Sequence, residues 1–175
     1  MIVLATTLSV LVLSSALAGS KLAKRKSVNE TSSKCPEKWL DASFMEMGCL
    51  LFNNTAAVTW EEAKAICKED SNATLVDIQS EMQLDFLGME LDVIANAEGT
   101  SHYWWTAGTD AGREGQWYWA TTLTEVGDFV WAPYEPNQTG NCLYLVSNWG
   151  YKGGDRSCET TRGIYPICQL KWFYQ

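Results

Sequence analysis

A helical pattern of apolar and polar residues is the first clear feature of the chain. Glu62 follows Thr59 by three residues, and this pair forms a capping box, which is typical of a helix start. Apolar residues then recur at the helical period and are expected to face the core: Trp60, Ala63, Ile66 and Cys67. We therefore predict a helix that runs to about Asp70.

A second helix is predicted to begin at Ser80, where Gln83 would be the partner in another capping box. The residues expected on its inner side are Met82, Phe86 and Leu87. Between the two helices, residues 73–78 alternate as in a short strand.

The pattern changes after Gly99 to short aromatic and apolar runs that are separated by glycine and polar residues. We predict strands in these runs, at residues 103–105, 116–119, 129–131, 142–146 and 164–170. Apolar pieces on either side of Gly48, at 39–40 and 50–52, predict a hairpin before the first helix. Two helices followed by short strands indicate an α+β fold. Its long connections, at 106–115 and 133–141, are suited to carry function.

The N-terminal segment differs from the rest of the chain. Residues 2–17 are mostly apolar and end in Ala16-Leu17-Ala18, which predicts a secretory signal peptide over residues 1–18. The alternative is an uncleaved membrane anchor, for which the run is short. Residues 19–34 are polar, include the basic stretch 21–26, and are expected to form a flexible leader. The predicted domain then spans residues 35–170, with a tail at 171–175.

Charge and cysteine content restrict the possible functions. The net charge of −8 argues against nucleic acid or an anionic membrane surface as a partner. Secretion makes the six cysteines a disulfide framework, in which spacing alone leaves every pairing open. With one histidine, His102, and no Cys-x-x-Cys pair, a zinc site is not expected. No Ser-His-Asp set or Cys-His pair is evident, so we predict that the protein is not an enzyme.

Taken together, these residues resemble the long form of the C-type lectin domain over about residues 35–170. The matching features are Cys35 and Cys49, the helical Cys67, the Trp105-Thr106-Ala107-Gly108 segment, the Glu135-Pro136-Asn137 triplet, and the closing Cys142, Cys158 and Cys168. Residues 103–119 also resemble secreted arthropod lectins. The resemblance implies a C-type lectin-like fold with two helices, short antiparallel sheets, a long ligand loop and three disulfides. The implied pairs are Cys35–Cys49, Cys67–Cys168 and Cys142–Cys158.

In that family, Glu-Pro-Asn forms one side of a calcium site that binds mannose-type sugars. The resemblance implies that Glu135 and Asn137 each bind both the calcium ion and a sugar hydroxyl, with a cis peptide bond before Pro136. Asp155 would be a further ligand of the ion and part of the sugar site. Calcium takes about six to eight oxygen ligands, which leaves positions for two neighbouring hydroxyls.

Two departures from the family pattern reduce the ligand set. Gly154 stands where the family has an asparagine, and Gly140 stands where a glutamate is common. Asn141 is a candidate substitute among the metal ligands. Trp149 is the candidate for stacking on a sugar, whereas three other tryptophans are assigned to the core: Trp105, Trp117 and Trp119.

Four Asn-x-Ser/Thr sequons predict N-glycosylation, at Asn29, Asn53, Asn72 and Asn137. A glycan on Asn137 would remove its amide from the sugar site, so glycosylation and ligand binding exclude each other at this residue. Without the cysteine pattern, Glu135-Pro136-Asn137 and Asp155 are also explained as ordinary turn residues.

The leading hypothesis is a secreted, calcium-dependent lectin for mannose-type glycans, with a role in innate-immune recognition or agglutination at microbial surfaces. The alternative is a C-type lectin-like domain that binds protein or glycan ligands without calcium. The glycines at 140 and 154 favour this alternative, because they stand where calcium ligands are expected. The mature chain is not expected to insert into a membrane. The sequence leaves the oligomeric state open.

Overall fold

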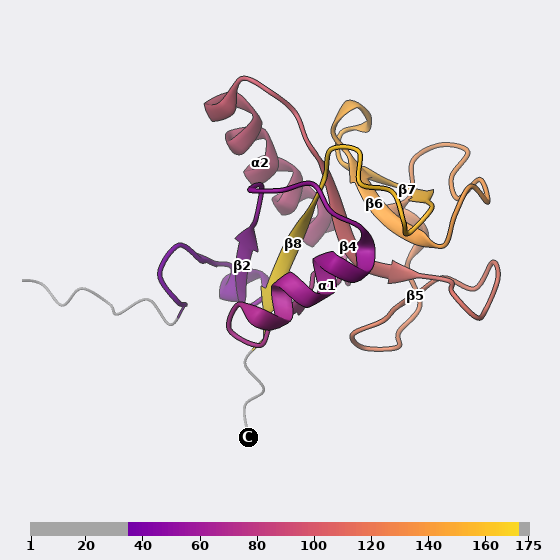
Figure 1. Cartoon of the computed structure of the whole chain (residues 1–175), viewed down its shortest axis with the longest axis horizontal. Coiled ribbons are helices and arrows are strands. Elements are labelled where there is room, and N and C mark those ends of the chain that lie inside the picture. The colour runs from indigo at the N-terminus through magenta and orange to yellow at the C-terminus, as the bar shows by residue number, and fades with distance from the viewer. Residues whose placement is uncertain (1–34, 172–175) are drawn as a thin grey trace, which may run out of the picture. The chain divides into compact units, whose positions relative to one another are not determined.

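The computed structural model describes residues 35–171, which include the whole predicted domain (Figure 1). The predicted signal peptide, the leader with its sequon at Asn29, and residues 172–175 lie outside the described residues. Within the described part, neither helix is long and apolar enough to cross a membrane.

Helix α1 spans Trp60–Glu69 and begins as predicted with a capping box. The Thr59 hydroxyl oxygen accepts from the backbone N–H of Glu62, and the Glu62 carboxylate accepts from the N–H of Thr59 at 2.9 Å. Trp60, Ala63 and Cys67 are buried as expected, while Ile66 is only half-buried. The indole N–H of Trp60 donates to a backbone carbonyl of the sheet, at Thr106, so the helix is fixed in place by packing and by a hydrogen bond.

Helix α2 spans Glu81–Glu98, and its inner face agrees with the prediction only in part. The predicted capping box is half formed, since the Ser80 side chain accepts from the N–H of Gln83 but the Gln83 side chain does not return to Ser80. Phe86 and Leu87 are buried, but Met82 is 68% exposed, so the prediction for Met82 is wrong. Gln83 takes an inward position instead, because its side-chain amide is hydrogen-bonded there on both the nitrogen and the oxygen. It donates to the carbonyl of Met45 at 2.9 Å and accepts from the N–H of Gln79 at 2.7 Å.

Over residues 35–171, eight strands form one hydrogen-bonded network. They are β1 (Leu40–Asp41), β2 (Cys49–Phe52), β3 (Thr74–Leu75), β4 (Tyr103–Thr109), β5 (Tyr118–Trp119), β6 (Cys142–Val146), β7 (Lys152–Arg156) and β8 (Ile164–Leu170). The main path runs β1-β2-β8-β4-β6-β7, with β3 beside β8 and β5 beside β4. Every pairing is antiparallel except that between β4 and β8. Figure 1 shows the connections between β4 and β6 on the β5–β7 side, away from β2.

The predicted strands agree with this sheet only in part. Strand β4 continues to Thr109, into the connection predicted at 106–115, and the strand predicted at 116–119 is reduced to β5. Residues 142–146 and 164–170 are strands with the predicted bounds, whereas the strand expected over 73–78 is reduced to β3. The run 129–131 is not a strand, because residues 128–130 form a turn of 3-10 helix. Strand β7 was not predicted, since its Gly153-Gly154 pair is more typical of a turn.

Three disulfides cross-link the domain in the pairs that the resemblance implies. Cys35–Cys49 closes the N-terminal hairpin, Cys67–Cys168 joins α1 to β8, and Cys142–Cys158 joins β6 to the segment after β7. The tryptophans assigned to the core are buried, with Trp105 and Trp119 fully enclosed and Trp117 8% exposed. The framework thus holds the loops between β4 and β7 on a rigid base.

Candidate functional site

The loop that carries Glu135 and Asn137 is held in a tight shape by its own side chains. The peptide bond between Glu135 and Pro136 is cis, as the resemblance implies. The Asn137 side-chain amide donates to Glu135 Oε1 at 2.9 Å, and Asn137 Oδ1 accepts from the backbone N–H of Thr139 at 3.1 Å. Both functional side chains therefore lie on the same side of the loop.

Strand β7 brings Asp155 beside this loop. Asp155 is paired with Leu143 of β6 and is only 3% exposed. Its carboxylate accepts from the backbone N–H groups of Asn137, at 2.5 Å, and of Gly140, at 2.9 Å. Its backbone carbonyl accepts from the Thr139 hydroxyl at 2.8 Å. Asp155 thus anchors the loop, a role that its place in a glycine-rich segment did not predict.

The two carboxylates of the site influence each other's ionisation. Burial raises the pKa of the Glu135 carboxyl, and the neighbouring Asp155 adds to the increase through a side-chain hydrogen bond and charge repulsion. Burial also opposes ionisation of Asp155, but hydrogen bonds from the N–H of Asn137, from Glu135 and from the N–H of Gly140 bring its pKa below the ordinary value. Asp155 is therefore the carboxylate that stays charged, and Glu135 is the one that binds a proton first.

Glu135, Asn137, Asp155 and Trp149 line one hollow of about 350 Å³. Trp149, in a turn of 3-10 helix between β6 and β7, is 43% exposed, so part of its ring is free to contact a ligand. The structure therefore brings together four of the five residues that were predicted to bind sugar or metal.

The same hollow contains residues that the sequence did not single out, Tyr144 and Arg156 among them. Tyr144 belongs to an apolar strand run, which predicts a core residue, and it is indeed only 7% exposed. The Arg156 guanidinium lies 5.6 Å from the centre of the Tyr144 ring. Tyr144 lies on β6 and Arg156 on β7, and these two strands pair with each other. The contact could not be predicted because β7 was not predicted as a strand.

Asn141, the fifth predicted residue, is not among those that line this hollow. Its backbone carbonyl accepts from the Thr109 hydroxyl at 2.6 Å, which ties the start of β6 to β4. Its proposed role as a substitute ligand thus has no support from the position of the loop.

The glycines at 140 and 154 differ in the space around them. A Cβ on Gly140 would lie 1.9 Å from the backbone carbon of Arg156, so this position has no room for a side chain. A Cβ on Gly154 would lie 2.9 Å from the outer ring of Trp149, 3.2 Å from Tyr144 and 3.5 Å from the Glu135 carboxyl carbon. Aromatic rings therefore border the place where the family has an amide ligand.

Three side chains around the hollow carry oxygen atoms of the kind that bind calcium. Glu135, Asn137 and Asp155 offer side-chain oxygens around one open hollow, and such oxygens are the ligands that calcium prefers. Over residues 35–171, no group of three or more His, Cys, Asp or Glu side chains is placed to hold a metal ion. Glu135 and Asp155 are only two such side chains, and the third residue, Asn137, contributes an amide, so the set agrees with that finding. Water and ligand hydroxyls would have to supply the other positions.

The three sequons within the described residues are accessible to different degrees. Asn72 and Asn137 are exposed, and Asn53 is half-buried, with its side-chain oxygen accepting from the Thr55 hydroxyl at 2.7 Å. Asn137 is both a sequon residue and part of the wall of the hollow, so a glycan attached to it would stand at the opening.

This fold, with its cis-proline loop beside a glycine-rich strand, is that of a C-type lectin domain. The family model described as the lectin C-type domain matches residues 56–170, and the chain belongs to this family.

Two curated relatives and one solved structure show the range of the similarity. C-type lectin 37Da of Drosophila melanogaster is 32% identical over 112 residues, which are 58% of this chain and 56% of that protein. Mouse C-type mannose receptor 2 is 28% identical over 108 residues, which are 58% of this chain and 7% of the receptor. The cow carbohydrate-recognition domain of CD23, solved in the presence of a GlcNAc2Man3 oligosaccharide, has the same fold at 23% identity. Its TM-score is 0.61, with 81% of this chain and 98% of that chain covered.

The matched region is thus just over half the length of the fly relative and a small part of the receptor. Family membership makes carbohydrate binding the expected activity of the domain. It leaves the preferred sugar and the role of calcium to be argued from the site itself.

Proposed function

We propose that this protein is a secreted lectin that binds glycans with mannose-type vicinal hydroxyls in the hollow of Glu135, Asn137 and Trp149. The observation that carries the proposal is the convergence of an acceptor, a combined donor and acceptor, and an exposed aromatic ring on one opening. A sugar needs these groups, since its hydroxyls both donate and accept while its C–H face is apolar.

Each residue has a distinct part in this binding. The Glu135 carboxylate accepts from a sugar hydroxyl, and the Asn137 amide, which now donates to Glu135 at 2.9 Å, turns to donate to the neighbouring one. Asp155 acts by positioning, because its carboxylate holds the backbone of residues 137–140. Trp149 covers the apolar face of the sugar ring.

Calcium is proposed to bind in this hollow with lower affinity than a complete ligand set would give. Glu135, Asn137 and Asp155 would hold the ion, whose chemistry is to coordinate two vicinal hydroxyls of the sugar. The acid-before-amide order of Glu-Pro-Asn, together with the name of the mouse relative as a mannose receptor, favours the mannose type.

Binding without calcium is a second candidate, favoured by the surroundings of Gly140 and Gly154. One position has no room for a side chain, and the other is bordered by Trp149 and Tyr144. In this case Arg156 and Trp149 would make the main contacts with the ligand.

Titration calorimetry with methyl mannoside, in calcium and in a chelator, tests both candidates. Calcium-dependent heat that is lost in Asn137→Asp and reduced in Trp149→Ala is the expected result. The Asp change keeps the side-chain size but removes the amide donor. Binding that is unchanged by the chelator would support the second candidate, and absence of binding to mannose, glucose and fucose in both buffers would refute the proposal.

We further propose that the chain is exported through cleavage near Ala18, is glycosylated at its sequons, and recognises glycans on microbial surfaces. An N-terminal sequence of the secreted protein tests the first point. Agglutination of mannan-coated particles tests the last, provided that the protein presents more than one site per assembly.

A further inference from the structure

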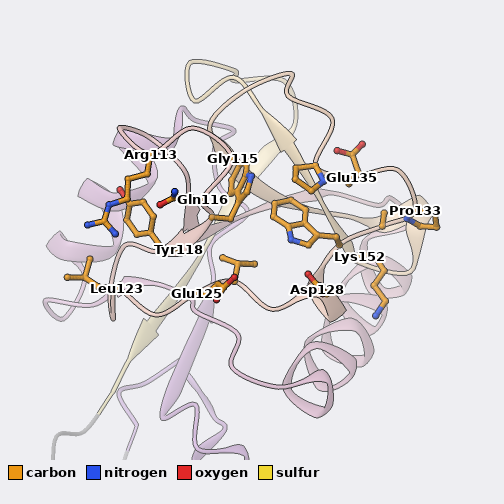
Figure 2. Close-up of a pocket in the computed structure, with 15 residues that line it drawn as sticks. Arg113, Gly115, Gln116, Tyr118, Leu123, Glu125, Asp128, Pro133, Glu135 and Lys152 are labelled. Atoms are coloured by element: carbon orange, nitrogen blue, oxygen red, sulfur yellow. The ribbon is translucent and has the colours of Figure 1, made fainter.

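A second and larger hollow lies next to the candidate sugar site. Its volume is about 940 Å³, against about 350 Å³ for the site itself, and Glu135 belongs to the wall of both. Figure 2 shows an elongated opening, with Glu135, Pro133 and Lys152 at one end and Arg113 and Leu123 at the other. A ligand that fills the sugar site can therefore continue into this hollow without leaving the surface.

The middle of this hollow is aromatic. Trp117 and Trp131 both line it, and their rings meet edge to face with centres 4.8 Å apart. Tyr118 is the third ring, and the Arg113 guanidinium lies 5.4 Å from its centre. Trp131 is half-buried, so this arrangement presents aromatic surface to solvent while the ring packing limits its movement. Such surfaces suit the apolar faces of sugar rings.

Polar side chains also line this hollow. Glu125 and Asp128 are exposed and lie along one edge in Figure 2. An antiparallel β-bridge joins the backbone of Glu125 to that of Tyr118, and the Lys152 ammonium donates to the carbonyl of Phe129 at 2.9 Å. Carboxylates accept strongly from hydroxyl groups, so both acids are suited to neutral sugars.

We infer that this hollow is an extended subsite that binds the inner sugar residues of a neutral oligosaccharide whose terminal residue occupies the candidate site. The inference rests on the proposed function. Small-molecule pockets have volumes of about 300–1,000 Å³, and the second hollow lies at the upper end of this range. It therefore has room for a ligand larger than one sugar ring. The wall carries three carboxylates, Glu125, Asp128 and Glu135, against two cations, Arg113 and Lys152. This excess of negative charge favours neutral over acidic sugars.

The test compares methyl mannoside with a linear neutral mannotriose, both titrated calorimetrically into the full secreted protein. The wild type should bind the trisaccharide about tenfold more tightly, and Glu125→Gln with Asp128→Asn should lose this difference without a change for the monosaccharide. The matched control is Glu81→Gln with Asp85→Asn on α2, which makes the same change of charge at exposed positions outside both hollows.

A second measurement follows the tryptophan indole N–H signals of ¹⁵N-labelled protein. The signals of Trp117 and Trp131 should move with the trisaccharide and stay in place with the monosaccharide, whereas Trp149 should respond to both. Equal affinities for the two sugars, or an advantage that the double variant retains, would overturn the subsite while leaving the proposed function intact. Failure of the wild type to bind either sugar would overturn both.

Discussion

The substitution Gly154→Asn would restore the amide that the family has at this position, and its effect can be estimated from the structure. Gly154 does not have a left-handed backbone, so a side chain is allowed there. The new Cβ would lie 2.9 Å from the end of the Trp149 ring and 3.5 Å from the Glu135 carboxyl carbon. Trp149 is 43% exposed and can turn outward. We expect a loss of about 1 kcal/mol in unfolding free energy, at the low end for overpacking.

The gain should appear in calcium affinity. One further oxygen ligand beside Glu135 is expected to tighten calcium binding about tenfold, which corresponds to about 1.4 kcal/mol. The assay is a calorimetric calcium titration of wild type, Gly154→Asn and Gly154→Ala. The alanine variant introduces the same Cβ without an oxygen, so it separates the added ligand from the displacement of Trp149. Calcium binding that is no tighter in the asparagine variant than in the alanine variant would refute the reasoning.

Three other predictions concern ionisation, cross-links and glycosylation. Burial and the neighbouring Asp155 raise the pKa of Glu135 in the folded protein. The contribution of Glu135 to stability is therefore present at low pH and is lost as the pH rises through the pKa of the folded state. Glu135→Gln should accordingly raise the melting temperature at pH 7 and not at pH 3. An equal increase at both pH values would contradict this. Replacing Cys67 and Cys168 by alanine should cost about 5 kcal/mol in unfolding free energy, against about 3 kcal/mol for Cys35 and Cys49, because the cross-linked separations are 101 and 14 residues. Urea denaturation measures both costs, and a larger loss for the shorter loop would be inconsistent with the chain-entropy argument. Finally, secreted protein can be passed over a mannose column and its glycans located by peptide mass mapping. The retained fraction should lack glycan on Asn137, whereas glycan on Asn72 should be found equally in the retained and unretained fractions. Retained protein with Asn137 fully glycosylated would exclude the proposed role of its amide.

The sequence predicted those elements whose local pattern and tertiary surroundings agree. The box of Thr59 and Glu62 starts α1, and the apolar runs at 142–146 and 164–170 are strands because both faces are buried. The inner face of α2 was partly wrong for the opposite reason. Gln83 is polar, yet hydrogen bonds to Met45 and Gln79 satisfy its amide inside the fold, which turns Met82 to solvent.

The same comparison holds for the candidate site. The cysteine pattern and the Glu-Pro-Asn triplet were sufficient to predict that Glu135, Asn137 and Asp155 lie together, and all three line one hollow. Strand β7 was not predictable from local propensity, because glycine weakens a strand. Tertiary contacts stabilise it here, namely the pairing with β6 and a bridge between Gly153 and Trp131. Without β7, neither the loop contacts of Asp155 nor the position of Arg156 against Tyr144 could be derived.

The glycines of β7 connect the loss of a calcium ligand with the aromatic character of the site. Because Gly154 has no side chain, the Trp149 and Tyr144 rings lie only 2.9 and 3.2 Å from the place where its Cβ would stand. An amide at this position would require the Trp149 ring to move. An amide ligand at position 154 and the Trp149 ring would thus occupy the same volume, and in this chain the ring occupies it. Affinity for a single sugar should accordingly depend less on calcium, and more on Trp149, than in a domain with the complete ligand set. The adjoining hollow of Trp117 and Trp131 extends that aromatic surface toward a longer glycan.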